Sequence, residues 1–174
     1  MITIISSTNR KSALSRVVAE FYQSMLQEAG TESAILDLQQ LPADFVMSAL
    51  YENAGKNPIF NEMANLITQS EKFVFVVPEY NGSFPGVLKA FIDGLSYPNP
   101  FKGKKCAMVG LSSGVQGGAL AISHLTDIFN YLGMHVLALK VRIPGIEKSL
   151  VDGKVTDKLV LELLEMQIED LQKF

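Results

Sequence analysis

The stretch KFVFVV at residues 72–77 decides the fold, because five of its six side chains are apolar and Pro78 follows at once. Apolar side chains at consecutive positions are typical of a strand that is covered on both faces, as strands are in a parallel sheet between helices. Other β-type runs lie before and after this one, and longer helical patterns separate them. The sequence therefore predicts an α/β fold.

Strand and helix patterns alternate along the whole chain. Further strands are expected at residues 2–5, 33–38, 105–111 and 134–141. Apolar residues spaced three and four apart, with turn residues at the ends, predict helices at residues 12–29, 57–70, 85–96, 117–132 and 155–174. Five strands that alternate with helices imply right-handed crossovers, and so one parallel sheet between two helix layers. We expect a single domain spanning residues 1–174.

Composition excludes several classes of protein. Hydrophobic residues make up 48% of the chain and charged residues 19%, which is typical of a folded chain with a sizeable core rather than of a disordered one. The single cysteine, Cys106, excludes a disulfide framework and a multi-thiolate metal site. A net charge of −3 without a large basic cluster argues against nucleic-acid binding. With no signal peptide or membrane-spanning run, we expect a soluble, cytoplasmic protein.

The segment after the first strand, SSTNRKSALS at residues 6–15, is rich in hydroxyl groups and leads directly into a helix. A helix N-terminus offers unpaired N–H groups and a partial positive charge, and it therefore binds phosphate readily. Arg10 can add a charge-assisted hydrogen bond. The hydroxyl groups that can donate to phosphate oxygens belong to Ser7, Thr8, Ser12 and Ser15. This set favours a phosphate site, although a serine that only caps the helix would explain one hydroxyl.

Two further loops follow the third and fourth strands. PEYNGSFPG at residues 78–86 holds two prolines and two glycines in nine residues, which fixes a turn-rich backbone. Fixed backbone groups suit the edge of a planar heterocycle, with Tyr80 and Phe84 as its wall; an ordinary turn is the other interpretation. SSGVQGG at residues 112–118 permits close backbone approach to a ligand, or simply makes turns.

The remaining reactive side chains are assigned structural roles. Glu79 is the only carboxylate in these loops, and we assign no catalytic acid or base. Cys106 lies in an apolar strand and is expected to be an inert buried thiol. His124 and His135 have no ligand cluster, so no metal site is expected. The lysine-rich segment at residues 102–105 is expected to be a solvated strand entrance, with attraction of cofactor phosphates as the alternative.

Taken together, STNRKSALS, PEYNGSFPGVLKAFIDGLS and SSGVQGG resemble the NADPH-dependent FMN reductase family of flavodoxin-like proteins, which includes chromate-, quinone- and azo-dye-reducing members. The resemblance extends over essentially the whole chain. It implies a flavodoxin-like three-layer sandwich with five parallel strands in the order 2-1-3-4-5. It also implies that the protein is an enzyme with FMN as its cofactor.

The resemblance further implies a set of cofactor-binding residues. Those that would hold the FMN phosphate are Ser7, Thr8, Asn9, Arg10 and Ser15. Those that would line the isoalloxazine ring are Pro78, Glu79, Tyr80, Asn81, Gly82 and Ser83, with Ser113 and Gly114 closing its other side. NADPH or NADH would pass a hydride to FMN, and a quinone-like, flavin or other small electron acceptor would then take the electrons in a ping-pong cycle.

The family commonly forms dimers or tetramers, and two irregular segments carry apolar side chains that suit a partner surface. These segments are residues 41–56 and 97–101, and they lead us to expect a homodimer or homotetramer. The chain departs from the family's usual residues at Ser7 and Ala13 in the first loop, and at Ala90 and Gly94 in the helix after the second loop.

Two other functions remain as alternatives. The first is an FMN-binding electron carrier that does not oxidise NAD(P)H, and the second is a flavodoxin-like protein that has lost FMN. A regulatory module of the response-regulator type is disfavoured, because it would need an acidic cluster after the first strand and a phosphoacceptor aspartate after the third.

Overall fold

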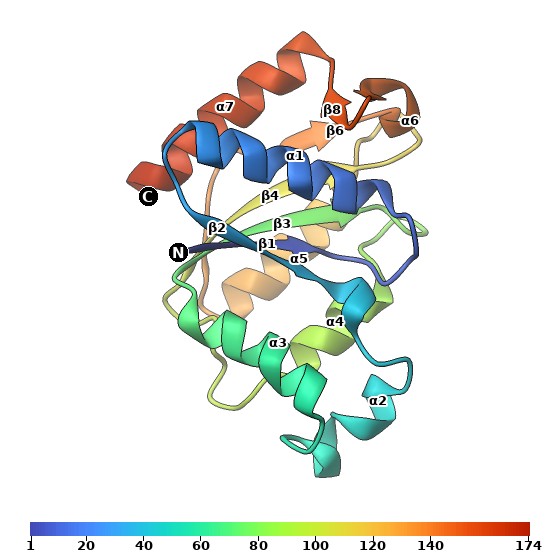
Figure 1. Cartoon of the computed structure of the whole chain (residues 1–174), viewed down its shortest axis with the longest axis vertical. Coiled ribbons are helices and arrows are strands. Elements are labelled where there is room, and N and C mark those ends of the chain that lie inside the picture. The colour runs from blue at the N-terminus through green and yellow to red at the C-terminus, as the bar shows by residue number, and fades with distance from the viewer.

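The central strand of the sheet is β3 (Lys72–Pro78), in which residues 73–77 are all buried. In the computed structural model, which describes residues 1–174, β3 pairs in parallel with β1 (Ile2–Ser6) and β4 (Lys105–Leu111). β2 (Ser33–Asp37) pairs with β1, while β5 (His135–Val136) and β6 (Val141–Ile143) pair with β4. The strand order β2-β1-β3-β4-β5 confirms the expected parallel sheet and its topology. Of these strands, Figure 1 labels β1 to β4.

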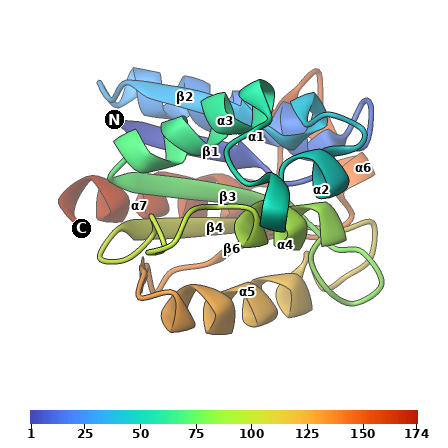
Figure 2. The same cartoon turned by 90° about the horizontal axis from the view of Figure 1, so that it is seen from below.

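Helices cover both faces of this sheet (Figures 1 and 2). One face carries α1 (Leu14–Glu28) and α7 (Lys158–Lys173). The other carries α3 (Pro58–Gln69), α4 (Gly86–Asp93) and α5 (Ala119–Tyr131). All five expected helices are present, each one to three residues shorter at either end than predicted. No helix combines the length and the apolar composition that crossing a membrane requires.

Alternation along the strands divides the interior into two cores. Val74 and Val76 of β3 pack in the core beneath α1 and α7, whereas Phe73, Phe75 and Val77 pack in the core beneath the other helices. Because both faces of β3 are covered, the strand needs apolar residues at every position, and this explains the KFVFVV run.

Short elements fill the irregular segments. Residues 38–53 form the single turns η1 (Leu38–Gln40), α2 (Phe45–Ser48) and η2 (Tyr51–Asn53). Between the sheet and α7, the chain forms α6 (Ile146–Ser149) and a hairpin of β7 (Leu150–Val151) and β8 (Lys154–Val155). The sequence patterns predicted none of these short elements.

The strand expected at residues 134–141 is divided in two. Cys106 of β4 pairs with Val136, and Val109 pairs with Val141. An advance of three residues along β4 therefore corresponds to an advance of five residues along the partner segment. The two extra residues bulge out of the ladder between β5 and β6. The prediction of one continuous strand was wrong, because periodicity does not show a local mismatch of register.

A buried glutamine of α7 fills the gap at this bulge. Gln167 is fully buried, and its Nε2 donates to the carbonyl oxygens of Met108 at 3.1 Å and Leu139 at 2.9 Å. Its Oε1 accepts a hydrogen bond from the Tyr22 hydroxyl at 3.3 Å. Burial also raises the pKa of Tyr22, so this hydroxyl stays protonated and remains a donor. One side chain therefore supplies hydrogen bonds that the interrupted ladder leaves out.

Replacement of Gln167 by alanine removes three hydrogen bonds from the core and leaves their partners unpaired. We expect Gln167→Ala to lower the free energy of unfolding by about 2–4 kcal/mol in urea titrations. Gln27→Ala, at an exposed position of α1, is the control and should change it by less than about 0.5 kcal/mol. Equal effects of the two substitutions would show that Gln167 does not stabilise the bulge.

Candidate functional site

The segments that follow β1, β3 and β4 meet at one edge of the sheet, because parallel strands all end at the same edge. With the start of α1 and the start of α6 they enclose a cavity of about 270 Å³. Its lining residues are Thr8, Arg10, Ser12, Ala13, Leu14, Ser15, Pro78, Tyr80, Leu111, Ser112, Ser113, Ile146 and Glu147. All three loops that the sequence singled out thus contribute to one cavity.

Two larger hollows lie at the opposite edge of the sheet, with volumes of about 530 and 600 Å³, and both include Gly30 and Glu32. They are more open than the cavity, and no buried polar atom without a partner lies there. The buried side-chain oxygens that lack a hydrogen-bond partner belong to Ser6, Ser15 and Glu79, at the edge that holds the cavity. Of these three residues Ser15 lines the smaller cavity, and its unmet hydrogen-bonding capacity makes this cavity the candidate functional site.

The start of α1 is arranged for an anion. Its N-cap residue is Ala13, so no side chain accepts a hydrogen bond from the N–H groups of the first turn. Ser15 in that turn is 1% exposed, and its Oγ has no partner. Arg10, on the cavity wall, forms no ion pair. A phosphate at this position would satisfy the hydroxyl, the backbone donors and the guanidinium together.

The residues predicted in the first loop divide into two groups. Thr8, Arg10 and Ser15 line the cavity. Ser7 lies outside the lining, and its hydroxyl donates to the Ile5 carbonyl oxygen at 3.2 Å within the same segment. Asn9 is exposed and also lies outside the lining. The segment is an irregular loop, and composition alone does not show which of its side chains face a ligand.

The second loop is a tight two-residue turn. Tyr80 and Ser83 exchange backbone hydrogen bonds of 2.7 and 3.0 Å across Asn81 and Gly82. Both central residues have positive φ, 51° and 73°, which is the geometry of a type I′ hairpin turn and explains the Asn-Gly pair. The Tyr80 hydroxyl is 2.9 Å from Thr8 Oγ1, and this hydrogen bond joins the first two loops at the cavity.

The other residues predicted in this loop have different surroundings. Pro78 lines the cavity with Tyr80, whereas Glu79 between them does not. The Glu79 amide donates to the Leu111 carbonyl oxygen at 2.9 Å and extends the β3–β4 pairing, while its Oε2 is buried without a partner. Ser83 Oγ is 2.8 Å from Nδ1 of His124 on α5, outside the cavity lining.

The glycines of the third loop mostly serve packing. Gly117 and Gly118 have φ of 59° and 81°, and a Cβ at Gly118 would lie 2.9 Å from the Leu111 nitrogen. These two residues therefore let the loop fold back onto β4. Gly114 has open space around it, and Ser113 lines the cavity. Turn formation, one of the two interpretations of this loop, explains Gly117 and Gly118. The other interpretation, close approach to a ligand, stays open at Ser113 and Gly114.

Sequence reasoning missed Glu147, which lines the cavity from α6. The Ser113 hydroxyl donates to Glu147 Oε1 at 2.5 Å, and this hydrogen bond is the main reason that the pKa of Glu147 is lowered. No motif surrounds the residue in the sequence. Only its position just after the last strand of the sheet could have indicated it.

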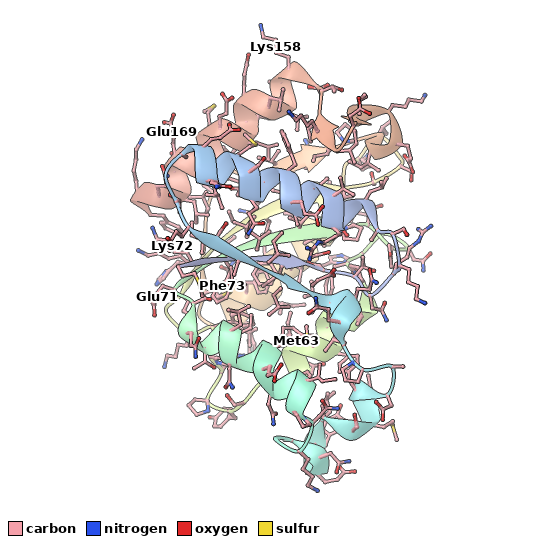
Figure 3. All side chains as sticks on the ribbon, in the orientation of Figure 1. Met63, Glu71, Lys72, Phe73, Lys158 and Glu169 are labelled. Carbon is pink, nitrogen blue, oxygen red and sulfur yellow. The ribbon has the colours of Figure 1, made fainter.

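The lysine cluster lies at the edge opposite the cavity, where Figure 3 labels Lys72. Lys72 Nζ donates to the carbonyl oxygens of Leu171 and Gln172, at the end of α7. Lys104 Nζ donates at the end of α3, and Lys105 Nζ contacts the Phe174 carbonyl oxygen. These ammonium groups stabilise helix C-termini, and they are too far along the strands to attract a phosphate to the cavity.

The cysteine is fully buried, as expected. Burial raises the pKa of Cys106 to about 12, so the thiol stays protonated and unreactive near neutral pH. No three side chains of histidine, cysteine, aspartate or glutamate lie close enough to hold a metal ion.

Comparison with known proteins agrees with this geometry. The sequence profile described as NADPH-dependent FMN reductase matches residues 1–147. The NAD(P)H-dependent FMN reductase PA1204 of Pseudomonas aeruginosa is 34% identical over 122 residues, which are 68% of this chain and 66% of that protein. A quinone reductase of Escherichia coli is 28% identical over all of this chain and 94% of its own length.

Solved structures share the fold. FerB, a flavoenzyme NAD(P)H:(acceptor) oxidoreductase from Paracoccus denitrificans, superposes with a TM-score of 0.80 at 25% identity, over 99% of this chain and 94% of its own. A flavodoxin from the domain Archaea superposes with a TM-score of 0.67 at 16% identity, over 99% of this chain and 98% of its own. The fold alone therefore does not distinguish a reductase from an electron carrier.

Proposed function

Because the chain belongs to the NADPH-dependent FMN reductase family, we propose that its cavity holds FMN and that it oxidises NADPH or NADH. A quinone-like, flavin or other small molecule is the electron acceptor in this proposal. When bound, FMN would supply the redox chemistry, that is, hydride acceptance from NAD(P)H and electron transfer to the acceptor in ping-pong order. The observation that carries the proposal is the buried, unpartnered Ser15 hydroxyl at the uncapped start of α1.

The proposed phosphate site combines three kinds of donor. The Ser15 hydroxyl and the first-turn N–H groups of α1 are fixed by the helix, so they need no rearrangement to bind. Arg10 contributes a positive charge from an exposed side chain that has no other partner. Thr8 completes the wall, held by its contact with Tyr80. A free helix end and an unpaired guanidinium both gain by binding a dianion.

The proposed ring site lies along the second and third loops. We assign contact with the isoalloxazine ring to residues 78–83, through Pro78 and Tyr80 on the cavity wall and through the backbone of the turn, with Ser113 and Gly114 at its other side. The type I′ turn fixes the backbone N–H and C=O groups of these residues, and Tyr80 presents an aromatic wall to the cavity. In this proposal the side chains of the protein bind and orient FMN and exclude water from it, and none acts as a catalytic acid or base.

We also propose that residues 1–174 act as one FMN-binding domain in the cytoplasm, where its reductant NAD(P)H is found. The cavity is bounded by segments from most of the chain, from Thr8 to Glu147, and α7 closes the core beneath it. In this proposal the cofactor and the substrates share this cavity.

The reductase and the carrier are separated by the colour of the purified protein. We expect it to be yellow, or to become so with one equivalent of added FMN, and to bleach when NADPH or NADH is added without oxygen. A quinone should then restore the colour. A yellow protein inert to both nucleotides would establish the carrier function instead, and a protein that takes up no FMN would refute the proposal.

Loss of a phosphate donor should weaken FMN binding. Hydrogen bonds to charged groups contribute about 1.5–3 kcal/mol, so we expect Ser15→Ala and Arg10→Gln each to raise the Kd for FMN by about 10–100-fold. Fluorescence quenching of FMN measures this. Because Ser15 Oγ has no partner in the free chain, Ser15→Ala should not lower the stability of the free protein.

The neighbouring exposed lysine provides the matched control for that experiment. Lys11→Gln also removes a positive charge from the loop, but Lys11 does not line the cavity. We expect a change in Kd of less than about 3-fold, as for an exposed charge that is screened by solvent and does not touch the ligand. If Lys11→Gln weakens FMN binding as much as Arg10→Gln does, the assignment of the phosphate site is wrong.

We propose that the protein is a homodimer or homotetramer. Several apolar residues in segments 41–56 and 97–101 are buried in the core and are not free for a partner, among them Phe45, Leu50 and Phe101. Others are exposed, with Met47, Tyr51 and Tyr97 at 76%, 77% and 98%. Exposed apolar side chains of this size favour self-association.

Size-exclusion chromatography with light scattering measures this assembly. We expect a mass of two or four chains, and a shift toward monomer in the double variant Met47→Glu/Tyr97→Glu. Glu162→Ala, on the exposed side of α7, should leave the mass unchanged. A monomer at all concentrations would contradict the proposal.

A further inference from the structure

One hydrogen bond on the wall of the cavity has no part in the function proposed so far. It joins Ser113, in the loop after β4, to Glu147 on α6, with the Ser113 hydroxyl as donor and 2.5 Å between the oxygens. Both residues line the cavity. Glu147 forms no ion pair, so Ser113 is the side chain that its carboxylate contacts.

This bond is not needed to hold the two segments together. Three backbone hydrogen bonds already join them, from Ser112 to the Ile143 oxygen at 3.3 Å, from Ile146 to the Ser112 oxygen at 3.1 Å, and from Gly145 to the Gly114 oxygen at 3.1 Å. The loop and α6 would keep their places without the side-chain contact. What the contact does determine is the direction of the Ser113 hydroxyl proton.

That direction sets what the serine can offer a ligand. A hydroxyl has one proton and two lone pairs, and a proton given to a carboxylate leaves only lone pairs for other partners. The charged Glu147 cannot donate either, because the hydrogen bond lowers the pKa of its carboxyl group. This part of the cavity wall therefore accepts hydrogen bonds. The opposite role falls to Arg10, in the loop before α1, and to Ser15, on α1, which donate them.

We propose that Glu147 is a positioning residue that holds the Ser113 hydroxyl as a hydrogen-bond acceptor for an N–H or O–H group of the bound flavin. The inference rests on the proposed function, since it takes FMN as the ligand. FMN carries both kinds of donor, an N–H at N3 of its ring and hydroxyl groups on its ribityl chain.

A double-mutant cycle on FMN affinity tests whether Glu147 acts through Ser113. We expect Ser113→Ala to raise the Kd by about 5–30-fold, the effect of one lost hydrogen bond of 1–2 kcal/mol. Glu147→Ala should raise it by roughly 3–10-fold, since the hydroxyl is then free to turn away. The double variant should match Ser113→Ala alone, because Glu147 has no effect without its partner.

Two further variants separate orientation from charge and from stability. Glu147→Gln keeps an oxygen that accepts from Ser113 and should stay within about 3-fold of the original Kd. Glu162→Ala removes an exposed acid of α7 far from the cavity and should have no effect on FMN affinity. The urea midpoint of Glu147→Ala should equal that of the unchanged protein, since the backbone bonds hold the loop.

The two donors of the flavin are distinguished with FMN methylated at N3. If N3–H is the donor, the unchanged protein binds the methylated flavin more weakly than FMN, and Ser113→Ala removes this preference. If a ribityl hydroxyl is the donor, Ser113→Ala weakens both flavins equally. Either result supports the proposal, and a Ser113→Ala variant that binds both flavins as the unchanged protein does would overturn it.

Other results would also overturn the proposal. Additive effects of Ser113→Ala and Glu147→Ala would show that the two residues act separately. A loss in Glu147→Gln as large as that in Glu147→Ala would show that charge matters rather than orientation. Failure of the unchanged protein to bind FMN would overturn both this inference and the proposed function, whereas tight FMN binding without coupling would overturn this inference alone.

Discussion

Parallel pairing of β1, β3 and β4 is the constraint on which the site depends. Because the strands run in the same direction, loops that are about seventy and thirty residues apart in the chain leave the sheet at one edge. The register Ser6↔Val76 and Pro78↔Leu111 then fixes how far each loop rises above that edge. The same connection places the start of α1 beside them, where its free N–H groups face the cavity.

The sheet and helices were predictable because their signals are local. An unbroken apolar run such as residues 72–77 needs covering on both faces, and a spacing of three and four apolar residues needs one covered side. The place of the first loop at the cavity was predictable for a similar reason, since the loop between a parallel strand and its helix lies at the carboxyl edge of the sheet. Ser15 lies in the first turn of α1, and its buried hydroxyl has no hydrogen-bond partner.

Features that depend on distant contacts were not predictable. The bulge between β5 and β6 depends on Gln167, which reaches it from α7. Glu147 lines the cavity because backbone hydrogen bonds hold the start of α6 against the loop after β4. Phe45 looks like a surface residue in an irregular segment but stacks on Phe60 with 6.1 Å between ring centroids. Gly94 is also explained only by packing, because a Cβ there would lie 2.5 Å from Phe60 Cζ.

A crystal structure of the protein with FMN tests the central claim most directly, because it locates the phosphate. The account predicts that a phosphate oxygen lies within hydrogen-bond distance of Ser15 Oγ and of the first N–H groups of α1, with the ring beside Tyr80. A phosphate bound anywhere else, such as the hollows around Gly30 at the opposite edge of the sheet, would contradict it.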